Sequence, residues 1–214
     1  MSKASAGHHT GDHSTRKQIL ESALRQFGHF GFSKVTMNDI AAEIGMGKAT
    51  LYYYFPTKEE LFQAVLENEH RQFICSLEDA AAKKGSAAKK IRHYVAMKMD
   101  NFYNMTNLNI ADFRNWHTVK PFLQETYQRF ADEEQAIIGH FLKGGMDAGD
   151  FTVTPVERIS YALLQVLRGL RCHFLRSIEG PRVDPEKFQQ LKQEALFVTD
   201  LILNGLKSST CASQ

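Results

Sequence analysis

Residues 45–58 read GMGKATLYYYFPTK and combine cationic, hydroxyl-bearing and aromatic side chains. Lysine binds phosphate oxygens by charge, and threonine and tyrosine hydroxyls donate hydrogen bonds to the same oxygens. Apolar side chains can contact a thymine methyl group in the major groove of DNA. No acidic residue, which would repel phosphate, occurs from Lys48 to Thr57. The composition of this stretch therefore favours contact with nucleic acid.

A helix over this stretch would sort its side chains into two groups. The helix must end before Pro56, because proline disfavours helical backbone at the preceding residue. At about 100° per residue, neighbouring side chains point in different directions. The predicted outward group is Lys48, Ala49, Thr50, Tyr52 and Tyr53. The predicted inward group is Leu51, Tyr54 and Phe55.

A second short helix is predicted just upstream. Thr36 is placed to cap the segment MNDIAAEI, with Asp39 three positions later, as in a capping box. Gly45 reaches, at little cost, the positive φ that a tight turn requires. The small side chain of Ala41 lets the two helices cross closely. With a longer helix upstream, the segment predicts a three-helix domain that contains a helix-turn-helix.

Positive charge is concentrated near the start of the chain. Residues 1–58 hold seven Lys or Arg and four Asp or Glu, whereas all 214 residues hold 26 and 24. A basic module on a neutral body fits polyanion binding, because cations that neutralise phosphates supply the sequence-independent part of nucleic-acid affinity. Residues 1–14 are rich in Ser, Gly, Thr and His and are predicted to form a disordered tail.

Several protein classes are not expected. The three cysteines lack CxxC spacing, which argues against a disulfide framework or a zinc module, and we expect no metal and no cofactor. No apolar run is long enough for a signal peptide or a membrane span, so we expect a soluble cytoplasmic protein. No nucleophile elbow, phosphate loop or acid/base pair appears, so we do not expect an enzyme.

Residues 19–66 resemble the N-terminal domain of the TetR family of transcriptional regulators. The resemblance rests on Phe30-Gly31-Phe32, on the Thr36 cap with DIA at 39–41, and on KATLYYYF at 48–55 followed by PTKEEL. It implies a DNA-binding domain over residues 15–58 and a helical ligand-binding and dimerisation domain over 59–214. The chain departs from the family pattern at Gly47, where Ser or Thr is usual, and at Ala49 and Tyr53.

The resemblance also implies roles for individual residues. Thr36 and Lys48 would contact phosphates from two helix N-termini, where free N–H groups favour anions. Thr50, Tyr52 and Tyr53 would bond phosphates or pack on sugars, and Ala49 and Tyr53 would contact bases. Lys58 would contact the DNA backbone.

The remainder of the chain predicts long helices, so we expect an all-α protein of about nine helices. Among them are predicted helices at 87–105, 109–117 and 121–146. The helix at 155–178 is apolar on more than one face, and the helix at 185–206 adds further apolar residues from Phe188 to Ile202. We therefore expect a homodimer in which these last two helices of each subunit form a four-helix interface.

The middle helices are rich in methionine and aromatic residues, which can line an apolar ligand cavity. The candidate ligand-binding residues are Met99, Phe102, Tyr103, Phe113, Trp116, His117, Tyr127 and Phe130. A plain hydrophobic core is the alternative interpretation. Because few charges interrupt the region, we expect a small hydrophobic effector.

The leading interpretation is a TetR-like repressor that leaves a palindromic operator in double-stranded DNA when this effector binds. An all-helical enzyme and a ligand-independent architectural DNA-binding protein are the alternatives. The sequence names neither the operator nor the effector.

Overall fold

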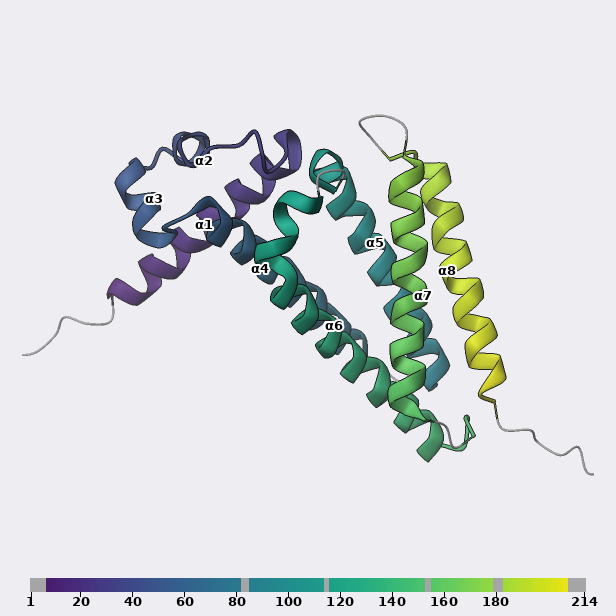
Figure 1. The fold of residues 1–214 in the computed structure, drawn as a ribbon. Coiled ribbons are helices and arrows are strands. Elements are labelled where there is room, and N and C mark those ends of the chain that lie inside the picture. The colour runs from purple at the N-terminus through teal and green to yellow at the C-terminus, as the bar shows by residue number, and fades with distance from the viewer. Residues whose placement is uncertain (1–6, 82–84, 114–115, 153–154, 179–182, 208–214) are drawn as a thin grey trace, which may run out of the picture. The chain divides into compact units, whose positions relative to one another are not determined.

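The chain is described from a computed structural model, which describes residues 7–81, 85–113, 116–152, 155–178 and 183–207 (Figure 1). Side chains at 7–11, 79–81, 106–113 and 116–122 are not described. Eight helices account for most of the described residues. They are α1 (Gly7–Phe30), α2 (Met37–Glu43), α3 (Lys48–Tyr54), α4 (Lys58–Ala81), α5 (Ala87–Phe113), α6 (Trp116–Asp147), α7 (Val156–Ser177) and α8 (Pro185–Gly205).

The all-α prediction is confirmed, with one helix fewer than expected. The segments 87–105 and 109–117 were predicted as two helices, but α5 runs without interruption to Phe113. No glycine or proline occurs between Ala87 and Phe113, so nothing in the backbone forces a break there. Within the described residues, the one strand-like pairing is an isolated antiparallel bridge between Phe151 and Lys207.

The start of α1 differs from the predicted disordered tail. Helix α1 begins at Gly7, so residues 7–14 are helical, whereas residues 1–6 lie outside the described part of the chain. The Tyr54 hydroxyl forms side-chain hydrogen bonds with Asp12 and Thr15. This contact with the end of α3 anchors the early turns of α1, and it joins residues too far apart for a local sequence pattern to reveal.

The chain divides into two compact units, each described by itself. Unit 1 comprises Met1–Arg71 and Met105–Leu123, and unit 2 comprises Gln72–Asn104 and Gln124–Gln214. The first part of α4 thus belongs to the same unit as the helix-turn-helix. The first unit therefore extends beyond Lys58, where the sequence placed the domain boundary. The reason is that the first part of α4 packs on the helices before it, as Phe62 does on Phe27.

Three phenylalanines form the centre of unit 1. The rings of Phe27 and Phe62 meet edge to face with centroids 5.1 Å apart, and Phe32 lies 4.8 Å from Phe62. Such aromatic pairs each add about 0.5–1.5 kcal/mol beyond the burial of their surface. All three side chains are buried. The cluster therefore joins α1, the loop after it and α4 into one support for α2 and α3.

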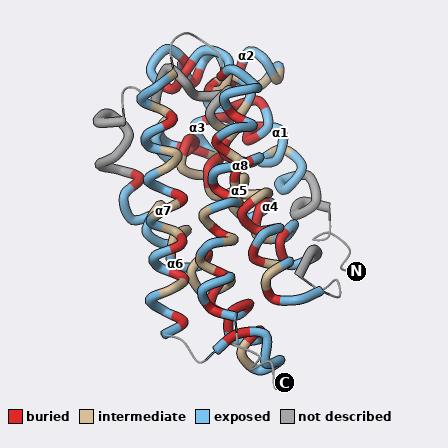
Figure 2. The backbone as a smooth tube through the Cα atoms, turned by 90° about the vertical axis from the view of Figure 1, so that its right-hand side faces the viewer, coloured by how far each residue is buried: buried red, intermediate tan, exposed pale blue. Residues whose placement is uncertain are grey.

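Unit 2 is built from long amphipathic helices. Along α7, buried residues recur every three to four positions from Val156 to Leu167, and Phe174 is buried two turns later (Figure 2). Asp184 caps the start of α8, and its carboxylate accepts a hydrogen bond from the Glu186 backbone N–H at 2.9 Å. No helix in the described ranges is long and apolar enough to cross a membrane.

Candidate functional site

A complete capping box starts α2. The Thr36 backbone N–H donates to Asp39 Oδ2 at 2.8 Å, and the Asp39 backbone N–H donates to Thr36 Oγ1 at 3.3 Å. The Thr36 hydroxyl also donates to Asp39 Oδ2 at 2.7 Å, and these bonds lower the pKa of Asp39. The predicted box is confirmed. The predicted phosphate contact of Thr36 stays a prediction, and it requires the hydroxyl proton to turn away from Asp39.

The turn between α2 and α3 has the predicted geometry. Gly45 has a φ of 64°, and the Met46 backbone N–H donates to the Ala41 carbonyl at 2.9 Å. Ile40, Ala41 and Leu51 are buried. Leu51 thus attaches α3 to its support, which fixes the direction in which the opposite face points.

The outer face of α3 carries the side chains that the helical period places there. Lys48, Ala49, Thr50, Tyr52 and Tyr53 are all exposed, and Tyr53 is the most exposed of the tyrosines at 82%. The Lys48 ammonium lies 5.7 Å from the centroid of the Tyr52 ring. The predicted orientation is confirmed, whereas contact of these residues with DNA stays a prediction.

Tyr54 and Phe55 face the support, as predicted. Phe55 is buried, and the Arg16 guanidinium lies 5.1 Å from its ring centroid. The hydrogen bond from the Tyr54 hydroxyl to the Asp12 carboxylate raises the pKa of Tyr54. The three consecutive tyrosines therefore have two different roles: Tyr52 and Tyr53 are exposed, whereas Tyr54 is half-buried and its hydroxyl faces α1.

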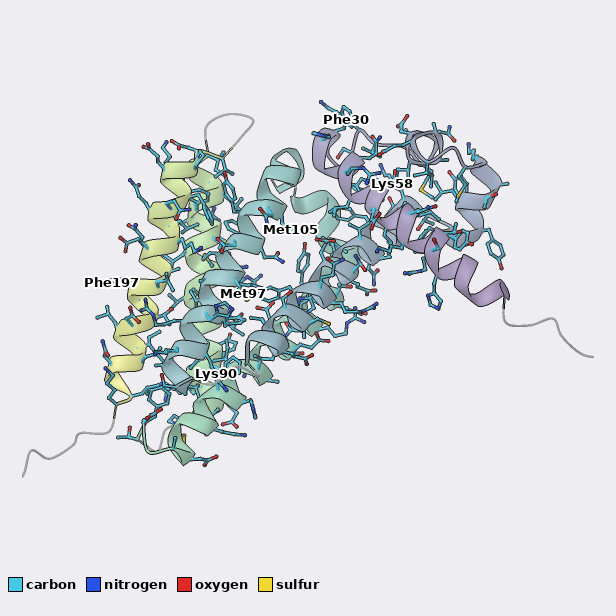
Figure 3. All side chains as sticks on the ribbon, turned by 180° about the vertical axis from the view of Figure 1, so that it is seen from behind. Phe30, Lys58, Lys90, Met97, Met105 and Phe197 are labelled. Carbon is cyan, nitrogen blue, oxygen red and sulfur yellow. The ribbon has the colours of Figure 1, made fainter. Side chains whose placement is uncertain are left out.

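Lys58 has intramolecular partners that the sequence did not reveal. Its ammonium donates to the backbone carbonyls of Phe32 at 2.9 Å and Val35 at 3.1 Å, and it lies 4.3 Å from the Phe32 ring centroid. Figure 3 labels Lys58. Two of its three donors are thus occupied. The predicted DNA-backbone contact stays a prediction and has one donor left to make it.

A polar link between α1 and α2 was also missed. Arg25 Nε donates to Glu43 Oε1 at 2.9 Å, and Gln26 donates to the other carboxylate oxygen. Partial burial would raise the pKa of Glu43, but the bonds from Gln26 and Arg25 outweigh it and lower the pKa. Consecutive polar residues on α1 offered no sign of their partner. Exposed pairs of this kind contribute about 0.2–1 kcal/mol.

The candidate ligand-binding residues that are described lie within unit 2. Met99 and Phe102 are buried, Tyr103 packs on Phe188 with ring centroids 4.4 Å apart, and Tyr127 lies 6.1 Å from Phe130. Three other candidates, Phe113, Trp116 and His117, have side chains outside the described part of the structure. The described candidates therefore come from α5 and α6 and include both core and half-buried positions.

The expectation that few charges interrupt this region is wrong. Glu134 is buried, with 3% of its side chain exposed, and Lys98 forms an ion pair with it at 16% exposure. Tyr94, fully buried, donates its hydroxyl proton to the second Glu134 oxygen. The Lys98 ammonium also lies 5.3 Å from the Phe73 ring centroid. The interior of unit 2 thus holds a charged, hydrogen-bonded group.

Burial and charge shift the pKa values in this group. Burial lowers the pKa of Lys98 to about 8, against the opposing charge of Glu134. Burial would raise the pKa of Glu134, but the charge and hydrogen bond of Lys98 hold it below its usual value. Burial also raises the pKa of Tyr127 to about 12. One sequence signal was available, because Lys98 lies four positions after Tyr94 and four before Phe102, on an otherwise apolar stripe.

The part of the chain that contains α2 and α3 matches a known family. A family model described as bacterial regulatory proteins, tetR family, matches residues 19–65. The HTH-type transcriptional regulator RutR of Escherichia coli strain K12 is 28% identical over 134 residues, covering 61% of this chain and 63% of that protein. The chain thus aligns with somewhat less than two thirds of the length of these curated relatives.

Solved structures extend the similarity over both units. A transcriptional regulator from Cytophaga hutchinsonii ATCC 33406 has a TM-score of 0.81 at 28% identity, covering 90% of this chain and 98% of that one. A putative transcriptional regulator from Saccharomonospora viridis has a TM-score of 0.70 at 19% identity, covering 91% and 98%, and shares the fold. The arrangement of α2 and α3 and the exposed face of α3 define a helix-turn-helix domain. Residues 19–65 thus match a domain of the TetR family.

The relatives named here are regulators and not enzymes, in agreement with the prediction from the sequence.

Proposed function

We propose that the chain is a dimeric transcriptional repressor that binds a palindromic operator and leaves it when a small ligand with an apolar body binds unit 2. The main support for this proposal is the outer face of α3. It presents Lys48, Tyr52 and Tyr53 on a helix held by the buried Leu51, and it contains no acidic side chain. A DNA-binding role would place the protein in the cytoplasm.

Helix α3 would enter the major groove of DNA. Lys48 and the hydroxyls of Thr50 and Tyr52 would contact phosphates and fix the orientation of the helix. Tyr53 and Ala49 project toward the bases, where the ring and the methyl group would contact thymine methyls. Ala49 offers no hydrogen bond, so its contribution to sequence preference would be purely apolar.

Exposed apolar side chains on α7 and α8 support a dimer. Tyr161, Phe197 and Leu201 are exposed at 55%, 57% and 56% (Figure 3 labels Phe197). A Cβ added at Gly169 on α7 would meet nothing within 4 Å, so a second helix could approach closely there. A second copy related by a two-fold axis would cover these residues and present two α3 helices to successive turns of DNA, about 34 Å apart.

Ligand control would work by population shift. A ligand that binds one arrangement of the dimer more tightly favours that arrangement, and the operator favours another. The Saccharomonospora viridis neighbour was solved in complex with choline, which supports small-molecule binding by proteins of this fold. The buried group in unit 2 is where we expect the ligand to bind.

The test compares Lys48→Ala with Lys89→Ala, an exposed lysine of unit 2. Affinity for a duplex selected from random sequence is measured by fluorescence anisotropy over a range of salt. Loss of one phosphate contact lowers the slope of log affinity against log salt by about one unit. We expect this change for Lys48→Ala alone. Equal salt slopes for the two variants would contradict a phosphate contact by Lys48 of α3.

The same binding assay separates the alternative functions. A ligand-dependent loss of DNA binding supports the repressor, whereas DNA binding that no ligand changes supports an architectural protein. Turnover of the ligand during the assay would support the enzyme.

A further inference from the structure

Arg171 on α7 lies beside the buried group of unit 2. Its guanidinium carbon is 5.6 Å from the centroid of the Phe102 ring, and its charge influences Tyr94, Lys98, Tyr127 and Glu134. Arg171 is half-buried, so a ligand can reach it. Within the described residues, it forms no salt bridge with a carboxylate.

The nearby carboxylate is already engaged. Lys98 binds one oxygen of Glu134, and the Tyr94 hydroxyl donates to the other. The ion pair is therefore neutral as a unit. Arg171 adds one positive charge to the group, and among the described residues no carboxylate forms a salt bridge with it. A half-buried cation without a counter-charge is unfavourable, and an anion beside it would offset that cost.

The side chains around Arg171 match an amphipathic anion. A guanidinium binds a carboxylate through two parallel N–H donors, which gives both strength and orientation. The rings of Phe102 and Phe174 are buried with centroids 6.3 Å apart, and they make the surroundings of the guanidinium apolar. A cationic ligand would face the like charges of Arg171 and Lys98.

We propose that the group around Arg171 takes a ligand with a carboxylate on an apolar body, whose carboxylate binds the Arg171 guanidinium. This inference rests on the proposed ligand control of DNA binding, and it names the chemical class of the ligand. It refines the purely hydrophobic effector expected from the sequence, because the apolar body is kept and a charged head is added.

Three probes with the same ten-carbon tail test the proposal: decanoate, decanol and decyltrimethylammonium. Their binding to the full-length protein is measured by isothermal titration calorimetry below their micelle concentrations. A charge-assisted hydrogen bond contributes about 1.5–3 kcal/mol, so decanoate should bind about tenfold or more tightly than decanol. Decyltrimethylammonium should bind most weakly.

Two variants localise the effect. Arg171→Gln should reduce the affinity for decanoate to that for decanol and leave decanol unchanged. Arg158→Gln, an exposed arginine at the start of the same helix, should keep the wild-type preference. Equal binding of the three probes, tightest binding of the cation, no binding at all, or a preference retained in Arg171→Gln would each overturn the proposal.

Failure of the proposed function has a different readout. If decanoate binds through Arg171 but the protein binds no DNA, or keeps its DNA when decanoate is added, the ligand class stands and the proposed control of DNA fails. If decanol releases the DNA and decanoate does not, the proposed control of DNA binding stands and the proposed ligand class fails.

Discussion

Gly145, near the end of α6, has no room for a side chain. A Cβ added there would lie 2.4 Å from Cδ2 of Phe151 and 2.8 Å from the Cβ of Ala87. The Phe151 ring cannot move away freely, because it is buried and its backbone N–H donates to the Gly145 carbonyl at 3.2 Å. Gly145→Ala should therefore destabilise unit 2.

The expected magnitude combines two opposing effects. Overpacking a core by one methyl group costs about 1–3 kcal/mol. Alanine gains about 1 kcal/mol over glycine in a helix, which reduces the net loss for Gly145→Ala to about 0–2 kcal/mol. Gly144 is the matched control, since a Cβ added there meets nothing within 4 Å. Gly144→Ala should gain up to about 1 kcal/mol.

Thermal unfolding followed by circular dichroism measures both variants. For a chain of this size, 1 kcal/mol corresponds to about 2–4 °C in Tm. We expect a lower Tm for Gly145→Ala and a higher Tm for Gly144→Ala, in each case by a few degrees. Equal stabilisation by the two substitutions would refute the contact between Gly145, Phe151 and Ala87.

Two further predictions concern the interior and the outer face of unit 2. Glu134→Gln leaves Lys98 without its counter-charge and should cost about 3–5 kcal/mol at pH 7 in urea unfolding. The pKa of Lys98 is about 8 in the folded chain, against an ordinary 10.5. Between these two pH values the folded state binds fewer protons than the unfolded state, so Lys98 makes stability rise with pH. The loss in Glu134→Gln should therefore shrink at pH 9, where Lys98 is mostly neutral, and an equal loss at both pH values would contradict the charge argument. Phe197→Glu should convert the dimer to a monomer in analytical ultracentrifugation, whereas a wild-type chain that is already monomeric would rule out the α7–α8 interface.

Features set by neighbouring residues were predictable from the sequence. The capping box of Thr36 and Asp39, the turn at Gly45 and the end of α3 before Pro56 each depend on a few consecutive residues. The helical period then determined which side of α3 faces outward. Gly47, a departure from the family pattern, caps α3 with no side-chain hydrogen bond, so the helix begins there without the usual hydroxyl.

Features that join distant residues were not predictable. Tyr54 meets Asp12, Lys58 meets the carbonyl of Phe32, and Lys98 meets Glu134, in each case across 26 or more positions. Periodicity shows that a side chain faces inward, but it does not show which side chain it meets. The sequence showed a charged Lys98 on an otherwise apolar stripe of α5. It did not show the partner, Glu134, because that depends on how α5 and α6 pack within unit 2.

The central claim is that the chain reads DNA as a two-fold dimer through α3. The most direct test incubates the purified protein with a library of random duplexes, recovers the bound fragments and sequences them. We predict enrichment of an inverted repeat with half-site centres about one helical turn, or a multiple of it, apart. The same selection with Tyr53→Ala should lose or alter the enriched bases. Recovery of no sequence above the starting library, or of a single unrepeated site, would contradict the claim.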